Sequence, residues 1–179
     1  LLSDDAVQVN AVVPQSFTFS ISSNSINFGA LSPLGAKYAS STNVDGDLTD
    51  TVAHTLTIAS NASAGYTITL QGATLTSQQN SPDTITKAGS IPVTSSPGTE
   101  QFGIYATASG GVGGAIATPY ATVSSFGFES TATTSSVFAT GTGSSGSTIY
   151  SLHYLANISS LTEAGVYSAS LVYVGTSNF

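Results

Sequence analysis

The chain has 179 residues and a net charge of −7, with two basic residues, Lys37 and Lys87, against nine acidic ones. This balance excludes binding of nucleic acid through a basic surface, which needs clustered Lys and Arg to neutralise phosphates. Only 6% of residues are charged and 40% are hydrophobic, which excludes a charged disordered chain. No apolar run reaches the roughly 18 residues of a membrane span. We therefore expect one folded domain without a membrane-spanning segment.

Small hydroxyl side chains take the place of charges, since 31 Ser and 25 Thr make up 56 of the 179 residues. Cysteine is absent, which excludes a disulfide framework, a thiolate metal site and a thiol nucleophile. Cytosolic proteins usually rely on surface charge to stay apart. The composition therefore predicts an exported protein at the cell surface or outside the cell, and we expect that a signal peptide has already been removed.

The first thirteen residues carry a strand-like alternation. Val7, Val9, Ala11 and Val13 alternate with Gln8, Asn10 and Val12, and Pro14 then interrupts the pattern because it cannot donate to a ladder. Two interpretations fit. The segment is either the first strand of the domain itself, kinked at its end, or a detachable arm that adds a strand to the sheet of a neighbouring subunit.

Two-residue alternation continues along the rest of the chain and predicts strands near residues 17–21, 26–28, 55–59, 66–70, 150–154 and 166–174. The middle is less regular: strands are expected around Phe102, Ile104 and residues 123–128, and loops over residues 80–98 and 110–114. About ten short strands with Gly, Pro, Ser and Asn at the turns predict an all-β sandwich. We place it at residues 14–179, with residues 1–13 as an extension.

One segment is dense in oxygen ligands: Asn43, Asp45, Asp47 and Asp50 lie around a glycine in NVDGDLTD. Such spacing could hold Ca²⁺, although the late Glu of an EF-hand loop is missing. An acidic surface turn is the alternative interpretation. Calcium is the only cofactor candidate, because GTGSSG (residues 141–146) precedes a strand, whereas a dinucleotide fingerprint precedes a helix.

Catalytic signatures are weak. His54 and His153 are the only histidines, each lies in a strand pattern, and no G-x-S-x-G elbow is present, so we do not expect an enzyme. Asn61 and Asn157 each begin an N-x-S triplet and are candidate glycosylation sites. Tyr105 and Tyr120, if exposed, could stack on sugars, which would suit a carbohydrate-binding or adhesive module and would make surface glycans a partner.

Both ends of the chain resemble a known family. The segments VQVNAVVPQSFTFS (residues 7–20), INFGALSP (26–33), TLTIASNASAGYTITL (55–70) and AGVYSASLVYV (164–174) follow one another as in the pilins of chaperone–usher fimbriae and the related spore-coat-protein-U-like secreted proteins. Residues 71–148 have no counterpart in the pattern. The resemblance implies an immunoglobulin-like or jelly-roll sandwich that lacks one strand, which the N-terminal extension of the next subunit supplies.

The resemblance also implies roles for particular residues. Val7, Val9, Ala11 and Val13 would be the donor positions, and the acceptor groove would be lined by Phe17, Phe19, Tyr167, Leu171 and Tyr173. The disulfide that those pilins commonly carry is missing here. Dependence on a chaperone therefore does not carry over, and a chaperone-independent fibre subunit fits equally well.

We therefore expect the structural subunit of an extracellular, pilus-like filament, a homopolymer in which each copy donates its N-terminal strand to the next. Two alternatives stay open at this point: a surface-layer or coat protein that tiles by side-to-side contacts, and the carbohydrate-binding module.

Overall fold

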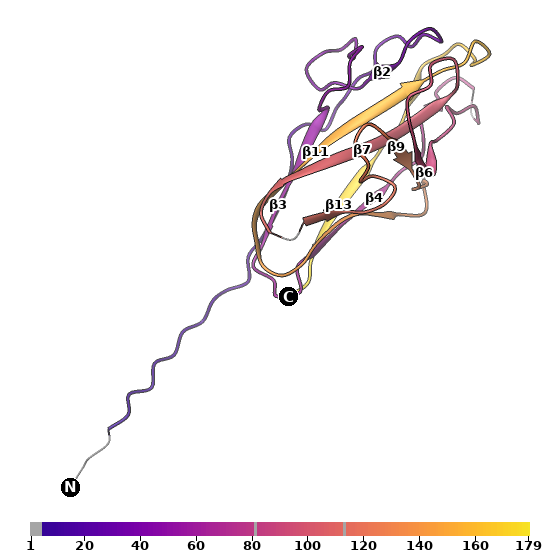
Figure 1. The fold of residues 1–179 in the computed structure, drawn as a ribbon. Helices are drawn as coiled ribbons and strands as arrows, with labels where there is room; N and C mark the ends of the chain where they lie inside the picture. Colours follow the sequence, from indigo (N-terminus) through magenta and orange to yellow (C-terminus); the bar gives the residue numbers. More distant parts are fainter. Residues whose placement is uncertain (1–4, 81, 113) are drawn as a thin grey trace.

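A computed structural model describes residues 5–80, 82–112 and 114–179. These residues form β-strands and connecting loops arranged as a sandwich, with an extended N-terminal segment that projects away from one end (Figure 1). The prediction of an all-β sandwich is confirmed. Within the same residues no helix is long and apolar enough to cross a membrane.

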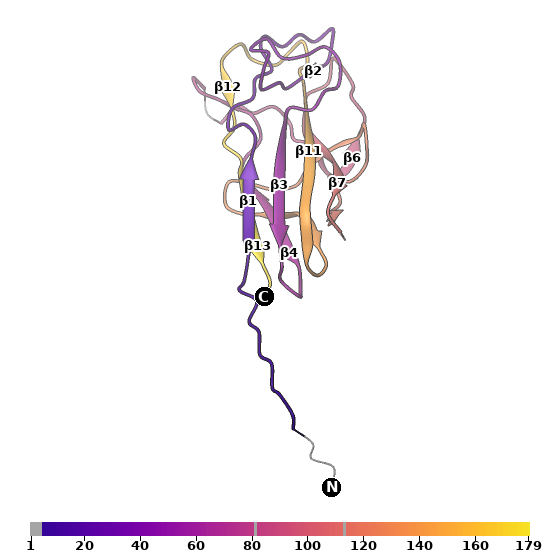
Figure 2. The ribbon, with the colours of Figure 1, turned by 90° about the vertical axis from the view of Figure 1, so that its left-hand side faces the viewer.

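The larger sheet has seven strands, and several of them lie side by side in Figure 2. In spatial order they are β1 (Phe17–Ile21), β3 (His54–Ser60), β11 (Ser145–Asn157), β7 (Gln101–Gly110), β9 (Phe126–Phe128) and β6 (Gly89–Val93), while β2 (Lys37–Tyr38) pairs with β11. All the pairings are antiparallel, and β1 is an end strand, joined to β3 from Phe17 opposite Ser60 to Ile21 opposite Leu56.

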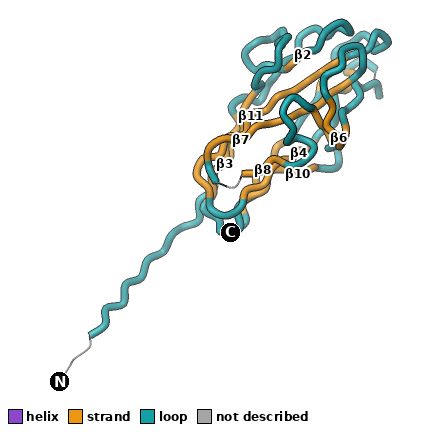
Figure 3. Tube along the Cα trace, in the orientation of Figure 1, coloured by secondary structure: helices purple, strands orange, loops and turns teal. Residues whose placement is uncertain are grey.

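The smaller sheet has four strands and forms the second layer (Figure 3). In spatial order they are β13 (Val172–Ser177), β4 (Tyr66–Gln71), β10 (Ser136–Gly141) and β8 (Gly114–Ile116). A separate two-stranded ribbon pairs β12 (Tyr167–Ser168) with β5 (Thr76–Ser77). β13 is the end strand of the smaller sheet.

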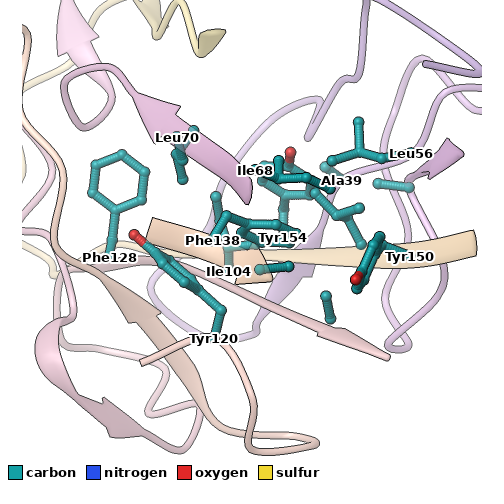
Figure 4. Packing of buried hydrophobic residues seen from close by; sticks show 14 of the residues in the cluster. Ala39, Leu56, Ile68, Leu70, Ile104, Tyr120, Phe128, Phe138, Tyr150 and Tyr154 are labelled. Carbon is teal, nitrogen blue, oxygen red and sulfur yellow. The ribbon is translucent and has the colours of Figure 1, made fainter. Parts of the chain in front are cut away.

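The core lies between the two sheets, where their inward-facing side chains meet (Figure 4). Ile68, Leu70 and Phe138 come from the smaller sheet, and Leu56 and Ile104 from the larger one; all are fully buried. Alternation places the Thr side chains of β3 and β4 on the opposite faces of these strands, as period-2 side-chain geometry requires. The patterned strands predicted near residues 17–21, 55–59, 66–70 and 150–154 are therefore confirmed.

Several segments differ from the predictions. Residues 7–13 form no strand, because no sheet of their own subunit lies beside them to pair with. The stretch predicted as a loop over residues 80–98 contains β6, which pairs with β9 through an irregular register. The run predicted over residues 166–174 divides into β12 and β13, which pair with β5 and β4 respectively.

The two end strands β1 and β13 approach each other closely at one place. A side chain at Gly175 in β13 would meet the ring of Phe19 at 2.9 Å and that of Phe17 at 3.3 Å. Only glycine lets both rings lie against β13, because a β-carbon would overlap them. The contact closes the sandwich at the end where β1 begins and β13 ends.

We expect Gly175→Val to lower the free energy of unfolding by about 1–3 kcal/mol, because the added methyl groups overpack this contact. Denaturant unfolding followed by tyrosine fluorescence measures the change. Thr176→Val is the matched control, since Thr176 is exposed, and it should change stability by no more than about 0.5 kcal/mol. Equal stability of the two variants would contradict the packing described here.

Candidate subunit interface

The N-terminal arm, which we define as residues 5–16, has no regular secondary structure and is exposed along its whole length. It extends away from the sandwich in Figures 1 and 3. Val7, Val9 and Val13 are more than 80% exposed. A row of exposed apolar side chains is typical of a surface that binds another molecule. The interpretation of this segment as the sandwich's own first strand is therefore wrong for residues 5–13, and Leu1 to Asp4 lie outside the described residues.

The arm joins the sandwich through the side chain of Asn61, in the turn between β3 and β4. The Asn61 Nδ2 donates to the carbonyl of Pro14 at 2.8 Å, and its Oδ1 accepts from the amide of Ser16 at 2.7 Å. The Asn61 amide also donates to the carbonyl of Ser16 at 3.1 Å. These three bonds continue the β1–β3 ladder by one residue and keep the chain extended as it leaves the sandwich.

The outer edges of β1 and β13 are both unpaired within the part of the chain that the structure describes. The two strands run in opposite directions: each is antiparallel to its neighbour, and those neighbours, β3 and β4, are consecutive strands joined by a short turn. An exposed edge presents a row of free N–H and C=O groups that invites pairing with another chain. The sandwich thus has an open seam where a strand could pair with one sheet or with both.

A groove of about 1100 Å³ lies along this seam. It extends beyond the C-terminal end of β1 and the N-terminal end of β13, into the loops around residues 23–31 and 162–169. Most of its lining is apolar or aromatic, and the walls come from segments that are far apart in the sequence. The apolar and aromatic lining residues are Phe19, Ile21, Ile26, Phe28, Ala30, Leu31, Val44, Leu75, Phe102, Tyr154, Ile158, Ala164, Val166, Tyr167, Ala169, Leu171, Val172 and Tyr173.

Four of the five residues predicted for an acceptor groove line this one: Phe19, Tyr167, Leu171 and Tyr173. Phe17, which lies two residues nearer the end of the sandwich where the arm leaves, does not line it. Along β12 and β13 the inward positions from Tyr167 to Tyr173 keep the predicted alternation, being half-buried between exposed neighbours. The structure therefore collects these four side chains on one surface, while their role in binding a strand stays a prediction.

Sequence reasoning missed the wall formed by Ile26, Phe28 and Leu31. The Ile26–Phe28 alternation marked this segment as apolar, but it predicted a strand of the sandwich, whereas the segment is a loop with one isolated bridge, from Asn27 to Ser40. Leu75, Phe102 and Ile158 were also missed. They lie in three separate segments, and only the folded topology brings them together.

Polar groups at the floor of the groove form a short chain. The His54 Nε2 lies 2.8 Å from the Tyr154 hydroxyl, which lies 2.7 Å from the Tyr173 hydroxyl. The other ring nitrogen of His54 is buried without a partner in the described residues. Burial lowers the pKa of His54 from 6.5 to about 4, since the charged form would lose its hydration. The imidazole is therefore neutral at pH 7.

The residues proposed for calcium do not form one site. The Asn43 side chain donates to the Asp47 carboxylate at 3.0 Å, and Thr51 donates to the same carboxylate at 2.8 Å. Asp50 points elsewhere, accepting a hydrogen bond from the Tyr105 hydroxyl and pairing with His153 at 2.8 Å. Among the described residues no group of three or more acidic or His side chains is placed to hold a metal ion. The interpretation as an acidic turn fits these contacts, and the calcium interpretation does not.

The features that pointed to sugars are mostly buried. Tyr105 is 3% exposed and stacks on His153, and Tyr120 is fully buried beside Phe138. Neither offers a surface for stacking on a carbohydrate, so the expectation that they are exposed is wrong. Asn157 is 1% exposed, with its amide held against Ser95 and Gln101, which excludes a sugar there in the folded protein. Asn61 is exposed, but its amide is occupied at the base of the arm.

In comparisons with family models, curated proteins and solved structures, none matched this chain.

We expect the free energy of unfolding to decrease as the pH is lowered, because of His54. The unfolded chain binds a proton at this residue below about pH 6.5 and the folded chain only below about pH 4. The contribution of the neutral His54 to the free energy of unfolding is therefore complete above pH 6.5. It is lost as the pH falls towards 4, and the loss is at most about 3 kcal/mol. Denaturant unfolding at pH 7 and pH 4.5 measures it in the wild type and in His54→Gln. Because the carboxylates titrate alike in both proteins, identical pH dependence would contradict a neutral, buried His54.

Proposed function

We propose that this protein is the structural subunit of an extracellular filament, and that each copy inserts its N-terminal arm into the groove of the next copy. One observation carries the proposal: an exposed arm with alternating apolar side chains and an uncovered apolar groove between two unpaired strand edges occur in the same chain. The arm would gain a strand partner, and the groove would gain the strand that covers it. The location outside the cell rests on the low charge and the absence of cysteine.

The placement of the two parts supports a head-to-tail arrangement. The arm leaves the sandwich at the end where β1 begins and where the C-terminus lies (Figure 2), and the groove opens towards the opposite end, around residues 23–31 and 162–169. An arm and a groove at opposite ends make a heterologous contact, which repeats without closing and builds an open filament.

The same placement sets the direction of the donated strand. An arm that enters at the open end has its Pro14 at that end, and its earlier residues lie deeper along the seam. It would then run antiparallel to β13 and parallel to β1, pairing with one edge or with both. Residues 5–13 span roughly 30 Å when extended, which suffices to pass along a strand of six residues such as β13.

The side chains of the arm suit the groove chemically. If Val7, Val9 and Val13 face inward, burying them contributes roughly 5–9 kcal/mol before the arm's ordering is counted. Ladder bonds with the strand edges satisfy the backbone of the arm and cover the edges that would otherwise aggregate. A carbohydrate module has less support, because Tyr105 and Tyr120 are buried. A surface lattice of side-to-side contacts would leave the arm without a partner.

We expect Val9→Asp to abolish filaments or raise the protein concentration needed for assembly at least about tenfold, because it would bury a charge in the apolar groove. Asn10→Asp adds the same charge on the opposite face of the arm and should assemble within about threefold of the wild type. Light scattering and electron microscopy across a dilution series measure both. Equal assembly of the two variants would contradict insertion with Val9 facing inward.

Deletion of residues 1–13 tests the arm as a whole. The truncated chain should stay monomeric or form only irregular aggregates, and a peptide of residues 1–13 should bind it with one-to-one stoichiometry while a scrambled peptide does not. Filaments of normal length from the truncated chain would overturn the proposed function.

A further inference from the structure

The last three residues of the arm, residues 14–16, form its joint to the sandwich and are held by one residue, Asn61. Asn61 bonds to the carbonyl of Pro14, to the amide of Ser16 and, through its own backbone, to the carbonyl of Ser16. Asn61 itself lies in a tight turn in which the amide of Gly65 donates to the carbonyl of Ala62 and the Ser60 hydroxyl accepts from the amide of Ala62. We call the bonds of Asn61 to Pro14 and Ser16 the clamp. The clamp therefore attaches the arm to the turn between β3 and β4.

The unpaired edge of β1 in the same subunit competes with a second copy for pairing with the arm. It directly precedes β1, whose outer edge is unpaired and borders the groove. A reversal of the chain at residues 14–16 would lay the arm against its own β1 as a hairpin. Such an intramolecular contact needs only a short loop and no second molecule, so it has a large advantage in effective concentration.

The observed joint is incompatible with that reversal. The bonds of Asn61 to Pro14 and Ser16 require an extended backbone between them, and a turn here would break at least the bond to the Pro14 carbonyl. The sequence does not favour a hairpin turn here, because Pro14-Gln15-Ser16 contains neither the Gly nor the Asn that tight hairpin turns favour.

We propose that Asn61 is a positioning residue that holds the joint extended, keeps the arm out of the groove of its own subunit and so reserves it for a second copy. This inference rests on the strand donation proposed above. The triplet Asn61-Ala62-Ser63 matches the glycosylation pattern, but the side-chain amide of Asn61 is bound to the Pro14 carbonyl of the arm.

The test compares Asn61→Ala with Ser63→Ala. Both variants destroy the glycosylation triplet, but only the first removes the clamp, since Ser63 is exposed and makes no hydrogen bond to the described residues of the arm. At equal concentration we expect Asn61→Ala to leave roughly tenfold more monomer than Ser63→Ala. Hydrogen exchange should show the amides of residues 5–13 protected in those Asn61→Ala monomers and unprotected in Ser63→Ala monomers.

Asn61→Asp is the second variant, for the case in which Asn61→Ala does not fold. It keeps the acceptor for the Ser16 amide and loses the donor to the Pro14 carbonyl, so we expect a monomer fraction between those of the other two variants. Assembly and exchange of the Asn61 variants equal to those of Ser63→Ala would overturn the clamp while leaving strand donation intact. Absence of filaments in the wild type and in Ser63→Ala would instead overturn the proposed function.

Discussion

The two unpaired strand edges that border the apolar groove are the constraint on which this account depends. The sandwich pairs its inner strands on both edges and buries its apolar faces between two sheets. Along the seam between β1 and β13 it does neither. An uncovered edge beside apolar side chains is a liability for a solitary protein, and a donated strand would satisfy the edge and the groove together.

The rest of the molecule is arranged around that seam. Gly175 lets Phe17 and Phe19 close one end of it, and the loops around residues 23–31 and 162–169 widen the other. The arm leaves from the closed end, held in line by Asn61.

Periodicity predicted the fold well where one face of a strand is buried. β3 and β4 were predicted almost to the residue, because apolar and Thr side chains alternate along them. β6 was missed because Gly89, Pro92 and an irregular register obscure its pattern. The arm has the alternation of a strand but pairs with no strand among the described residues of its own subunit, a difference that a local sequence pattern does not show.

The site was predicted in part for the same reason. Tyr167, Leu171 and Tyr173 share one face of a C-terminal alternation, so the sequence identified them as a group. Phe102 and Ile158 reach the groove only through long-range topology. Burial could not be foreseen for Tyr105, Tyr120 or Asn157, whose neighbours come from distant strands.

Electron cryomicroscopy of assembled full-length protein tests the central claim most directly, because the density can be followed from β1 back through residues 13 to 5. If strands are donated between copies, this segment leaves its own subunit, lies between β1 and β13 of the next copy and runs antiparallel to that β13. Density that places residues 5–13 against the β1 of their own subunit, or free in solvent between subunits, would contradict it.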